Sequence, residues 1–552
     1  MSIASGPAAP ARRAARRAAV ARRRSRRPTV RAVRSLPLLV FVVGAGSLGA
    51  EMAAARLLAP YFGDSTLIWA NTIGIVLVAL SVGHWLGGRF ADRHPDESRL
   101  RILVLGSAAL LSLVPLVAGP FLDLAVRGLD SIDAGAFVGS LIGMLGLIAI
   151  PLVLIGAVSP WALRLAVPDV AHAGSVAGRL SAIGTAGSLV GTFLSSLLLI
   201  PFVGTQRTFL LLALGMALVA AIGLPRRALL APLAIAALLA LPPGVTKPAA
   251  DGDRVLEEAE TLYQYARVVE HRTEDGDGGL PAGVERRLEL NEGQAIHSVW
   301  RADTHLTGNY WDAYQVLPFA VAGSGGPDGP IPPRRVAMLG NAGGTVGRAL
   351  LHYFPGIARV DGVEIDAKVS ELGRRWFAMP DGGRMRVHAK DARPFLREAT
   401  DRGRDPAGRY DLIGIDAYRQ PYIPFYLTTA EFFALVRDRL TPRGAAIVNV
   451  GHPERNHDLE RVLAATLRTA FPTVLSYRMT ATNTLLLATR ADASAARLAA
   501  TAPALPEELR PVARRAVEWL TDAPRGGRVY RDDKAPVEWL VDGSLISYAT
   551  GD

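Results

Sequence analysis

Glycines and carboxylates recur between residues 340 and 416, each time directly after a short apolar run. Glycines let a backbone approach a ligand closely at the positive end of a helix, and a carboxylate can accept the hydroxyl groups of a ribose. Glu364 lies 24 residues after Gly340, near the spacing at which such an acid meets a ribose. These residue types in this order predict a nucleoside-binding site. Its candidate residues are Gly340, Gly343, Gly344, Glu364, Asp391 and Asp416.

The apolar runs that precede these residues alternate with segments of helical length. The carboxyl ends of parallel strands meet at one edge of a sheet, and ligands bind beyond that edge. A single acid after a strand is more often a cap or turn residue, but several strand ends with suitable groups favour a binding edge. We therefore predict a soluble α/β Rossmann-like domain over residues 334–490, with strands near 336–339, 359–365, 385–388, 411–415 and 445–450.

Two segments flank this domain. Residues 250–325 contain stretches in which apolar and polar positions alternate, which predicts a small antiparallel β subdomain. Residues 323–333 are rich in glycine and proline and indicate a linker. Residues 491–552 form a C-terminal extension.

The N-terminal half is a series of long apolar runs. The chain is 50% hydrophobic with a mean hydropathy of +0.23, and a helix needs about 20 apolar residues to cross a bilayer. We predict a transmembrane domain over residues 36–241 with six to seven helices. Six runs are near 36–57, 66–87, 102–122, 136–158, 179–202 and 207–224. A seventh, 228–241, is short and contains Pro232, so we expect it to stay partial or interfacial.

The positive charge of the chain is concentrated in residues 1–35, which hold eleven arginines and no acid. The rest of the chain has equal numbers of basic and acidic residues, so its net charge is zero. We expect a cytoplasmic tail attracted to anionic lipid, with the protein in the cell membrane and the soluble domain on the cytoplasmic side. Nucleic acid is not an expected partner, because no aromatic residue is interleaved with the arginines. The chain has no cysteine, and its histidines form no evident metal-ligand set.

Residues 255–490 resemble the polyamine aminopropyltransferases, the spermidine synthase family, and the membrane-fused members that carry a transporter-like region. The segment 263–269 is similar to the family's entry strand, and Tyr310 and Asp312 to its tyrosine and acid upstream of a proline. The resemblance implies a methyltransferase-type fold. It implies that Gln264, the glycine loop, Glu364 (ribose side) and Asp391 (adenine side) bind the cofactor. It also assigns catalysis to Asp416 and Tyr418, and substrate binding to Tyr310, Asp312, Arg419 and Tyr422.

Two positions depart from the family's pattern. Gly343 stands where the family's loop has an aspartate, and Arg419 stands where its catalytic strand end has a second aspartate. Two unit charges about 4 Å apart interact by about 4 kcal/mol at an effective dielectric constant near 20. Reversing the charge at position 419 would therefore change the binding of a cationic substrate substantially.

The resemblance implies a transferase of polyamine biosynthesis that moves an aminopropyl group from decarboxylated S-adenosylmethionine to a polyamine, without a metal. The first alternative is a transferase that uses S-adenosylmethionine itself, since Arg419 would suit a carboxylate. The second is a transport or ligand-binding fusion protein without catalysis. A homodimer remains open.

Overall fold

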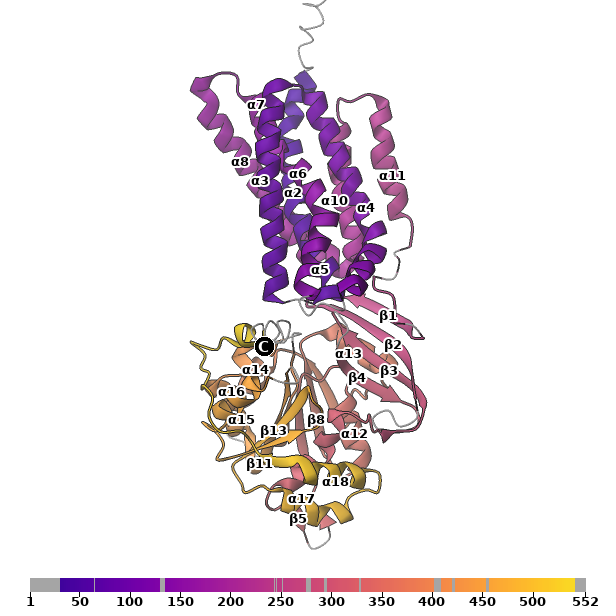
Figure 1. Ribbon diagram of the computed structural model, residues 1–552, viewed down its shortest axis with the longest axis vertical. Coiled ribbons are helices and arrows are strands. Elements are labelled where there is room, and N and C mark those ends of the chain that lie inside the picture. Colours follow the sequence, from indigo (N-terminus) through magenta and orange to yellow (C-terminus); the bar gives the residue numbers. More distant parts are fainter. Residues whose placement is uncertain are drawn as a thin grey trace, which may run out of the picture.

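The computed structural model describes residues 30–541, apart from short gaps at 64, 130–134, 243, 245, 251, 275–278, 292–294, 327–328, 402–408, 419–421 and 453–455. Most of the arginine-rich tail and Arg419 therefore lie outside the described residues. Figure 1 shows a helical bundle standing on an α/β body. This arrangement confirms the predicted fold class.

The bundle is built from long apolar helices. Five helical segments are long and apolar enough to cross a membrane, judged by length and composition: Ser35–Phe62, Ile68–Arg93, Glu97–Val126, Phe137–Ala166 and Val170–Val203. A sixth, Thr205–Ala221, is apolar but shorter. The helices are α2 (Val30–Phe62), α3 (Thr66–Arg93), α4 (Glu97–Leu129), α5 (Gly135–Met144), α6 (Ile150–Gly156), α7 (Val158–Ala166), α8 (Ala173–Phe193), α9 (Ile200–Val203), α10 (Thr205–Ala221) and α11 (Leu230–Leu239).

Hydrogen bonds identify the two ends of the bundle. At the end far from the α/β body, the Arg101 guanidinium donates to Ser35 Oγ at 2.5 Å and to the Val219 carbonyl at 2.9 Å. These groups belong to the beginnings of α4 and α2 and to the end of α10. At the near end, Arg56 on α2 donates to the Leu262 carbonyl at 2.6 Å, and Tyr61 donates to the Thr246 carbonyl at 2.8 Å. The N-terminal end of α2 and the α/β body therefore lie at opposite ends of the bundle.

The short seventh run, 228–241, contains the helix α11. α11 packs on α10 and α4 and directs the chain back towards the α/β body (Figure 1). The apolar run 228–241 is thus a further pass along the bundle rather than a segment that stays at the far end. The helix has ten residues, with Pro232 in its first turn, and it is not among the segments long enough to cross a membrane, so a partial seventh span stays a prediction.

The β subdomain is a four-stranded antiparallel sheet in the order β1-β2-β3-β4, as the alternating pattern predicts. Its strands are β1 (Arg254–Glu260), β2 (Tyr265–Thr273), β3 (Gly283–Leu290) and β4 (Ile296–Arg301). Residues Tyr310–Gln315 and Leu317–Ala320 instead form buried 3-10 helices in the main core. The expected linker contains a small pair of strands, β5 (Gly325–Gly326) and β6 (Gly329–Pro330).

The main sheet has eight strands in the order β14-β12-β13-β11-β10-β7-β8-β9. The five predicted strands correspond to β7 (Arg335–Leu339), β8 (Arg359–Glu364), β9 (Met385–Ala389), β10 (Tyr410–Ile415) and β11 (Leu440–Gly451), and they pair in parallel. Successive residues of β7 belong to two different hydrophobic cores, with Val336 and Met338 on one face and Ala337 and Leu339 on the other. Both faces of the sheet are therefore covered, as expected for parallel strands.

Helices cover the two faces, and three antiparallel strands extend one edge. The helices are α12 (Thr345–Tyr353), α13 (Ala367–Trp376), α14 (Ala392–Asp401), α15 (Ala430–Arg439), α16 (Asp458–Leu467), α17 (Ala495–Thr501) and α18 (Leu509–Trp519). The added strands are β12 (Thr473–Arg478), β13 (Asn483–Thr489) and β14 (Leu520–Asp522). Since β14 belongs to the expected C-terminal extension, that segment is an integral part of the sheet.

Candidate active site

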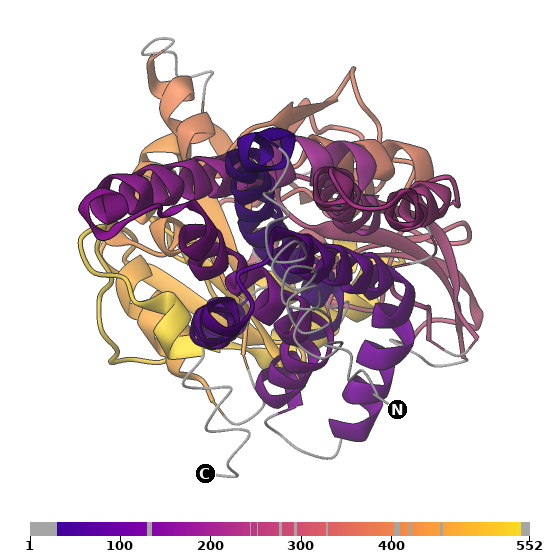
Figure 2. The same cartoon turned by 90° about the horizontal axis from the view of Figure 1, so that it is seen from above.

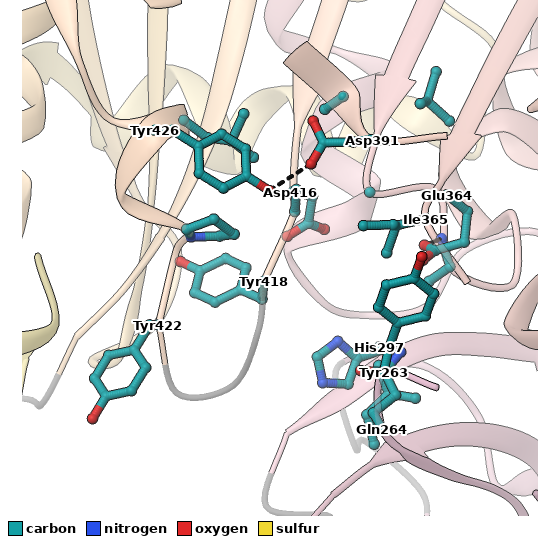
Figure 3. Close-up of a pocket in the computed structure, with 18 of the residues that line it drawn as sticks. Tyr263, Gln264, His297, Glu364, Ile365, Asp391, Asp416, Tyr418, Tyr422 and Tyr426 are labelled. Atoms are coloured by element: carbon teal, nitrogen blue, oxygen red, sulfur yellow. Dashed lines mark hydrogen bonds between the residues drawn. The ribbon is translucent and has the colours of Figure 1, made fainter. Parts of the chain in front are cut away.

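A cavity of about 720 Å³ lies at the carboxyl ends of β7, β8, β9 and β10. The order of these strands reverses between β7 and β10, and ligands of α/β sheets bind at such a reversal. In Figure 3, Asp391, Asp416, Tyr418 and Tyr426 lie on one side of the cavity, opposite Glu364, Tyr263 and Gln264. The cavity therefore lies at the sheet edge at which the strand-end argument predicts a binding site. The lining also includes Thr66 and Trp69 from the bundle, and Glu538 from the C-terminal segment.

Gly340 lies at the point where the strand order of the sheet reverses, between β7 and β10. Its φ is +84°, and a Cβ at this position would lie 2.3 Å from the Asp416 carbonyl oxygen. The loops after β7 and β10 can approach this closely only because residue 340 has no side chain. Gly340 lines the cavity, whereas Gly343 and Gly344 do not. Gly344, with φ of +84°, precedes the first turn of α12, so these two glycines shape the loop rather than the cavity wall.

Glu364 links the loops that follow β7 and β8 through hydrogen bonds. Its carboxylate accepts the Ala342 amide at 3.0 Å and the Asp366 amide at 3.1 Å. Burial raises the pKa of Glu364 to about 7. Gln264 lies beside it, with its side-chain amide 3.5 Å from Asp366 Oδ2. Both residues line the cavity, and their assignment to the cofactor side stays a prediction.

Asp391 lies at the end of β9 and is held by the loop after β10. Its carboxylate accepts the Tyr426 hydroxyl at 2.5 Å, shown dashed in Figure 3, and the Arg393 amide at 2.9 Å. Arg393 in turn forms an ion pair with Asp532 at 2.6 Å. Asp391 is therefore anchored by a segment more than 100 residues later in the sequence.

Asp416 is the most strongly organised carboxylate in the cavity. It accepts the Asn449 side-chain amide at 2.8 Å and the Tyr310 hydroxyl at 3.0 Å, and Trp311 also donates to it. Burial raises the pKa of Asp416 to about 6, although these three donors favour the ionised form. A carboxylate with this pKa is ionised at neutral pH and basic enough to accept a proton from a bound nucleophile.

Tyr418 and Tyr422 line the cavity, but their hydroxyl groups are engaged in the fold. The Tyr418 hydroxyl donates to the Asn449 carbonyl at 3.1 Å and accepts the Gly451 amide at 2.6 Å. The Tyr422 hydroxyl accepts the Thr66 amide of α3 at 3.1 Å. The Tyr418 hydroxyl is thus held against β11, and the catalytic assignment of this residue stays a prediction.

Two residues expected on the substrate side do not line the cavity. Asp312 accepts the Thr307 amide and hydroxyl at 2.8 and 2.9 Å and the Gly308 amide at 2.8 Å, so it holds its own loop. Tyr310 reaches the site only through its bond to Asp416 and is a positioning residue. Asn449 was missed by sequence reasoning, although it lies within the fifth predicted strand.

Residues 321–494 match the family model of the spermine/spermidine synthase domain. We call the α/β body of this chain the synthase domain after this match. The probable polyamine aminopropyl transferase of Bifidobacterium longum is 31% identical over 195 residues, which cover 35% of this chain and 36% of that protein. The polyamine aminopropyltransferase of Vibrio vulnificus is 32% identical over 147 residues, covering 27% and 46%. The match thus spans a third to a half of these relatives, and it confirms the resemblance for this part of the chain.

Solved structures similar to the chain include two kinds of transferase. A probable spermidine synthase from Corynebacterium glutamicum has 19% identity and a TM-score of 0.35, covering 51% of this chain and 98% of that one. Human methyltransferase-like protein 13 in complex with SAH has 21% identity and a TM-score of 0.29, covering 40% and 92%.

The synthase domain has no room for an aspartate at position 343. A Cβ there would lie 2.9 Å from Ser298 Oγ and 3.2 Å from the ring of Phe377. We expect Gly343→Asp to destabilise the domain by about 1–3 kcal/mol, since the side chain overpacks this site. Chemical denaturation of the two proteins would measure this loss. Gly356→Asp is the matched control, because the space around Gly356 is open; equal stability of both variants would contradict the prediction.

One group of potential metal ligands lies elsewhere in the synthase domain. Ligand atoms of His452, His457 and Glu460 lie within 4.8 Å of one another. However, Glu460 already accepts Ser476 Oγ at 2.7 Å and the Arg478 guanidinium at 3.1 Å. This cluster therefore resembles a structural polar network, and it is not part of the cavity lining.

Proposed function

We propose that the chain is a membrane-anchored aminopropyltransferase that uses decarboxylated S-adenosylmethionine and a polyamine acceptor. The observation that carries this proposal is the charge of the cavity. Its described lining has four carboxylates and one lysine, and that lysine, Lys390, forms an ion pair with Glu398 at 2.5 Å. Aromatic rings add to this surface and suit a cationic ligand. The carboxylates are Glu364, Asp391, Asp416 and Glu538; the rings are Trp69, Tyr263, Tyr418, Tyr422, Phe425 and Tyr426.

The proposed reaction needs one base. The amine nitrogen attacks the propyl carbon bonded to the sulfonium sulfur, and a C–N bond forms while the C–S bond breaks. The bonding electrons leave with sulfur, which becomes a neutral thioether. The amine proton passes to Asp416, whose pKa of about 6 suits this transfer. Asn449 and Tyr310 hold the carboxylate in position.

Calorimetric titration of the purified full-length chain tests the choice of donor. We expect decarboxylated S-adenosylmethionine to bind more tightly than S-adenosylmethionine, because the extra carboxylate of the latter would meet an acidic cavity. Product analysis with putrescine and spermidine then tests transfer. Preference for S-adenosylmethionine would instead support the first alternative, a transferase of another group. Binding without product would support a ligand-binding or transport protein.

We also propose that the bundle lies in the membrane and that the synthase domain faces the side opposite to the arginine-rich tail. The far end of the bundle follows that tail and has further arginines, whereas the near end has few. Positive charge in short loops marks the cytoplasmic side. The far-end arginines are Arg89, Arg93, Arg99, Arg101, Arg164, Arg179, Arg226 and Arg227; those near the other end are Arg56, Arg127 and Arg207.

This orientation differs from the expected cytoplasmic position of the soluble domain, which assumed six crossings. The natural absence of cysteine makes it testable with single-cysteine variants. Gly174 lies at the far end and Gly356 in the synthase domain, and both have open surroundings. We expect a membrane-impermeant maleimide to label Gly356→Cys in spheroplasts and Gly174→Cys only after permeabilisation. The reverse pattern would place the synthase domain in the cytoplasm and overturn the proposed orientation.

A further inference from the structure

We propose that the helical bundle completes the acceptor subsite and that Trp69 of α3 is a specificity-determining residue for the amine. Thr66 and Trp69 line the same cavity as Asp416, Tyr418 and Tyr422. This inference rests on the proposed function for the identity of the acceptor. The contribution of the bundle to the cavity wall rests on the fold alone.

The bundle is tied to the acceptor side by a direct contact. The first turn of α3 presents its Thr66 amide to the Tyr422 hydroxyl at 3.1 Å. Tyr422 is buried, with 6% of its surface exposed, so this contact lies within the docked interface. Trp69 follows one turn later on the same helix and faces the cavity beside Thr66. Figure 2 shows the bundle lying over the α/β body from above.

A second set of contacts fixes the opposite wall. Leu262 lines the cavity, and its carbonyl accepts the Arg56 guanidinium of α2 at 2.6 Å. Close by, Glu260 accepts the Thr205 amide of α10 at 2.8 Å. Three helices of the bundle therefore hold the two walls of the cavity relative to each other. Because the cavity lies between these contacts, bundle and synthase domain form one binding site.

The chemistry of Trp69 fits an alkylammonium ligand. Among side chains, the indole ring is the strongest aromatic partner for a cation, and its apolar face also packs on methylene groups. The acids of the cavity supply the negative charge. The indole gives a flat surface, and the place at which it contacts the bound amine can select the length of the acceptor. A tryptophan near a helix end can also act as an interfacial anchor. An anchor would affect membrane insertion but would leave the affinity for the amine unchanged.

Steady-state kinetics of the full-length chain in lipid nanodiscs separates these roles. We expect Trp69→Ala to raise the KM for putrescine or spermidine about 5- to 30-fold, the change expected for loss of a cation–π contact. The kcat and the KM for the donor should stay within about 2-fold, since the proposal gives Trp69 a contact with the amine and no part in proton transfer. Trp69→Phe should recover part of the loss. Trp85→Ala is the matched control, because Trp85 is on the same helix with 61% of its surface exposed.

An unchanged KM for the amine in Trp69→Ala would overturn the inference while leaving the proposed function intact. If the wild-type protein forms no product with any amine, the proposed function fails. A second readout still tests whether Trp69 is part of the cavity wall. In the cysteine-free chain, 5′-methylthioadenosine together with putrescine should slow maleimide modification of Trp69→Cys but not of Trp85→Cys. Equal rates with and without these ligands would show that Trp69 is outside the site.

Discussion

Asp416→Asn is expected to lower kcat by about 10² to 10⁴-fold while leaving donor affinity within about 2-fold. The variant keeps the shape of the side chain but removes the group that accepts the amine proton. Stopped assays of product formation and calorimetry on the same preparation would separate the two effects. Retention of more than about a tenth of the wild-type kcat would exclude Asp416 as the general base.

The pH profile of the wild type provides a related check. A general base works only when it is ionised, and the pKa of Asp416 is about 6. The rate should therefore fall about tenfold per pH unit below this value and be independent of this group above it. The profile of Asp416→Asn should lack this acidic limb.

Asn449 and Tyr310 are the positioning controls for this experiment. Each donates a hydrogen bond that favours the ionised carboxylate. Asn449→Ala and Tyr310→Phe should raise the pKa of Asp416, so the acidic limb should move to higher pH. A purely structural role would lower the amount of active protein without moving the limb.

Glu364→Gln is expected to weaken donor binding about 10- to 100-fold, because charged hydrogen bonds to two ribose hydroxyls contribute about 1.5–3 kcal/mol. Glu364 also accepts the Ala342 and Asp366 amides, so its charge supports the loop that approaches the donor. Titration of the donor into both proteins measures this loss. Glu371→Gln is the control, since Glu371 pairs with Lys368 and Arg375 on the exposed face of α13.

The pKa of Glu364 adds a pH dependence to this prediction. With a pKa of about 7, raised by burial, the free site is partly protonated at neutral pH. Since the ionised form accepts the ribose hydroxyls, donor affinity should rise between pH 6 and pH 8 and binding should release protons. Affinity that is independent of pH in the wild type would contradict this role, and Glu364→Gln should show no such rise.

The strand-end residues could be predicted because parallel strands impose their own geometry. Glu364, Asp391 and Asp416 are separated by 52 residues in sequence but share one sheet edge. Asn449 could have been found by the same reasoning, because it lies at the end of a predicted strand. Asp312 could not be placed correctly, because a short 3-10 helix gives no periodic signal for the direction of a side chain.

The sequence could not predict which distant segments contribute residues to the cavity. Thr66 and Trp69 reach the cavity only because the bundle docks on the synthase domain, and no local pattern encodes that docking. Glu538 reaches it because residues 530–532 bind α14 and α15, through bonds such as that from the Ala430 amide to the Tyr530 carbonyl at 2.8 Å. The direction of α11 depends on packing against α10 and α4 rather than on its hydropathy.

β14 and Glu538 come late in the sequence, and this determines the order in which the parts of the protein can fold during synthesis. A growing chain exposes its N-terminal segments first, and domains fold as their sequences become available. The helix that carries Trp69, α3, is complete long before β14, the edge strand of the main sheet, has been translated. The synthase domain must therefore close its sheet and its cavity late, after the bundle helices have been synthesised. Nascent chains that stall before residue 520 would lack the edge strand of the main sheet and the residue Glu538 of the cavity wall.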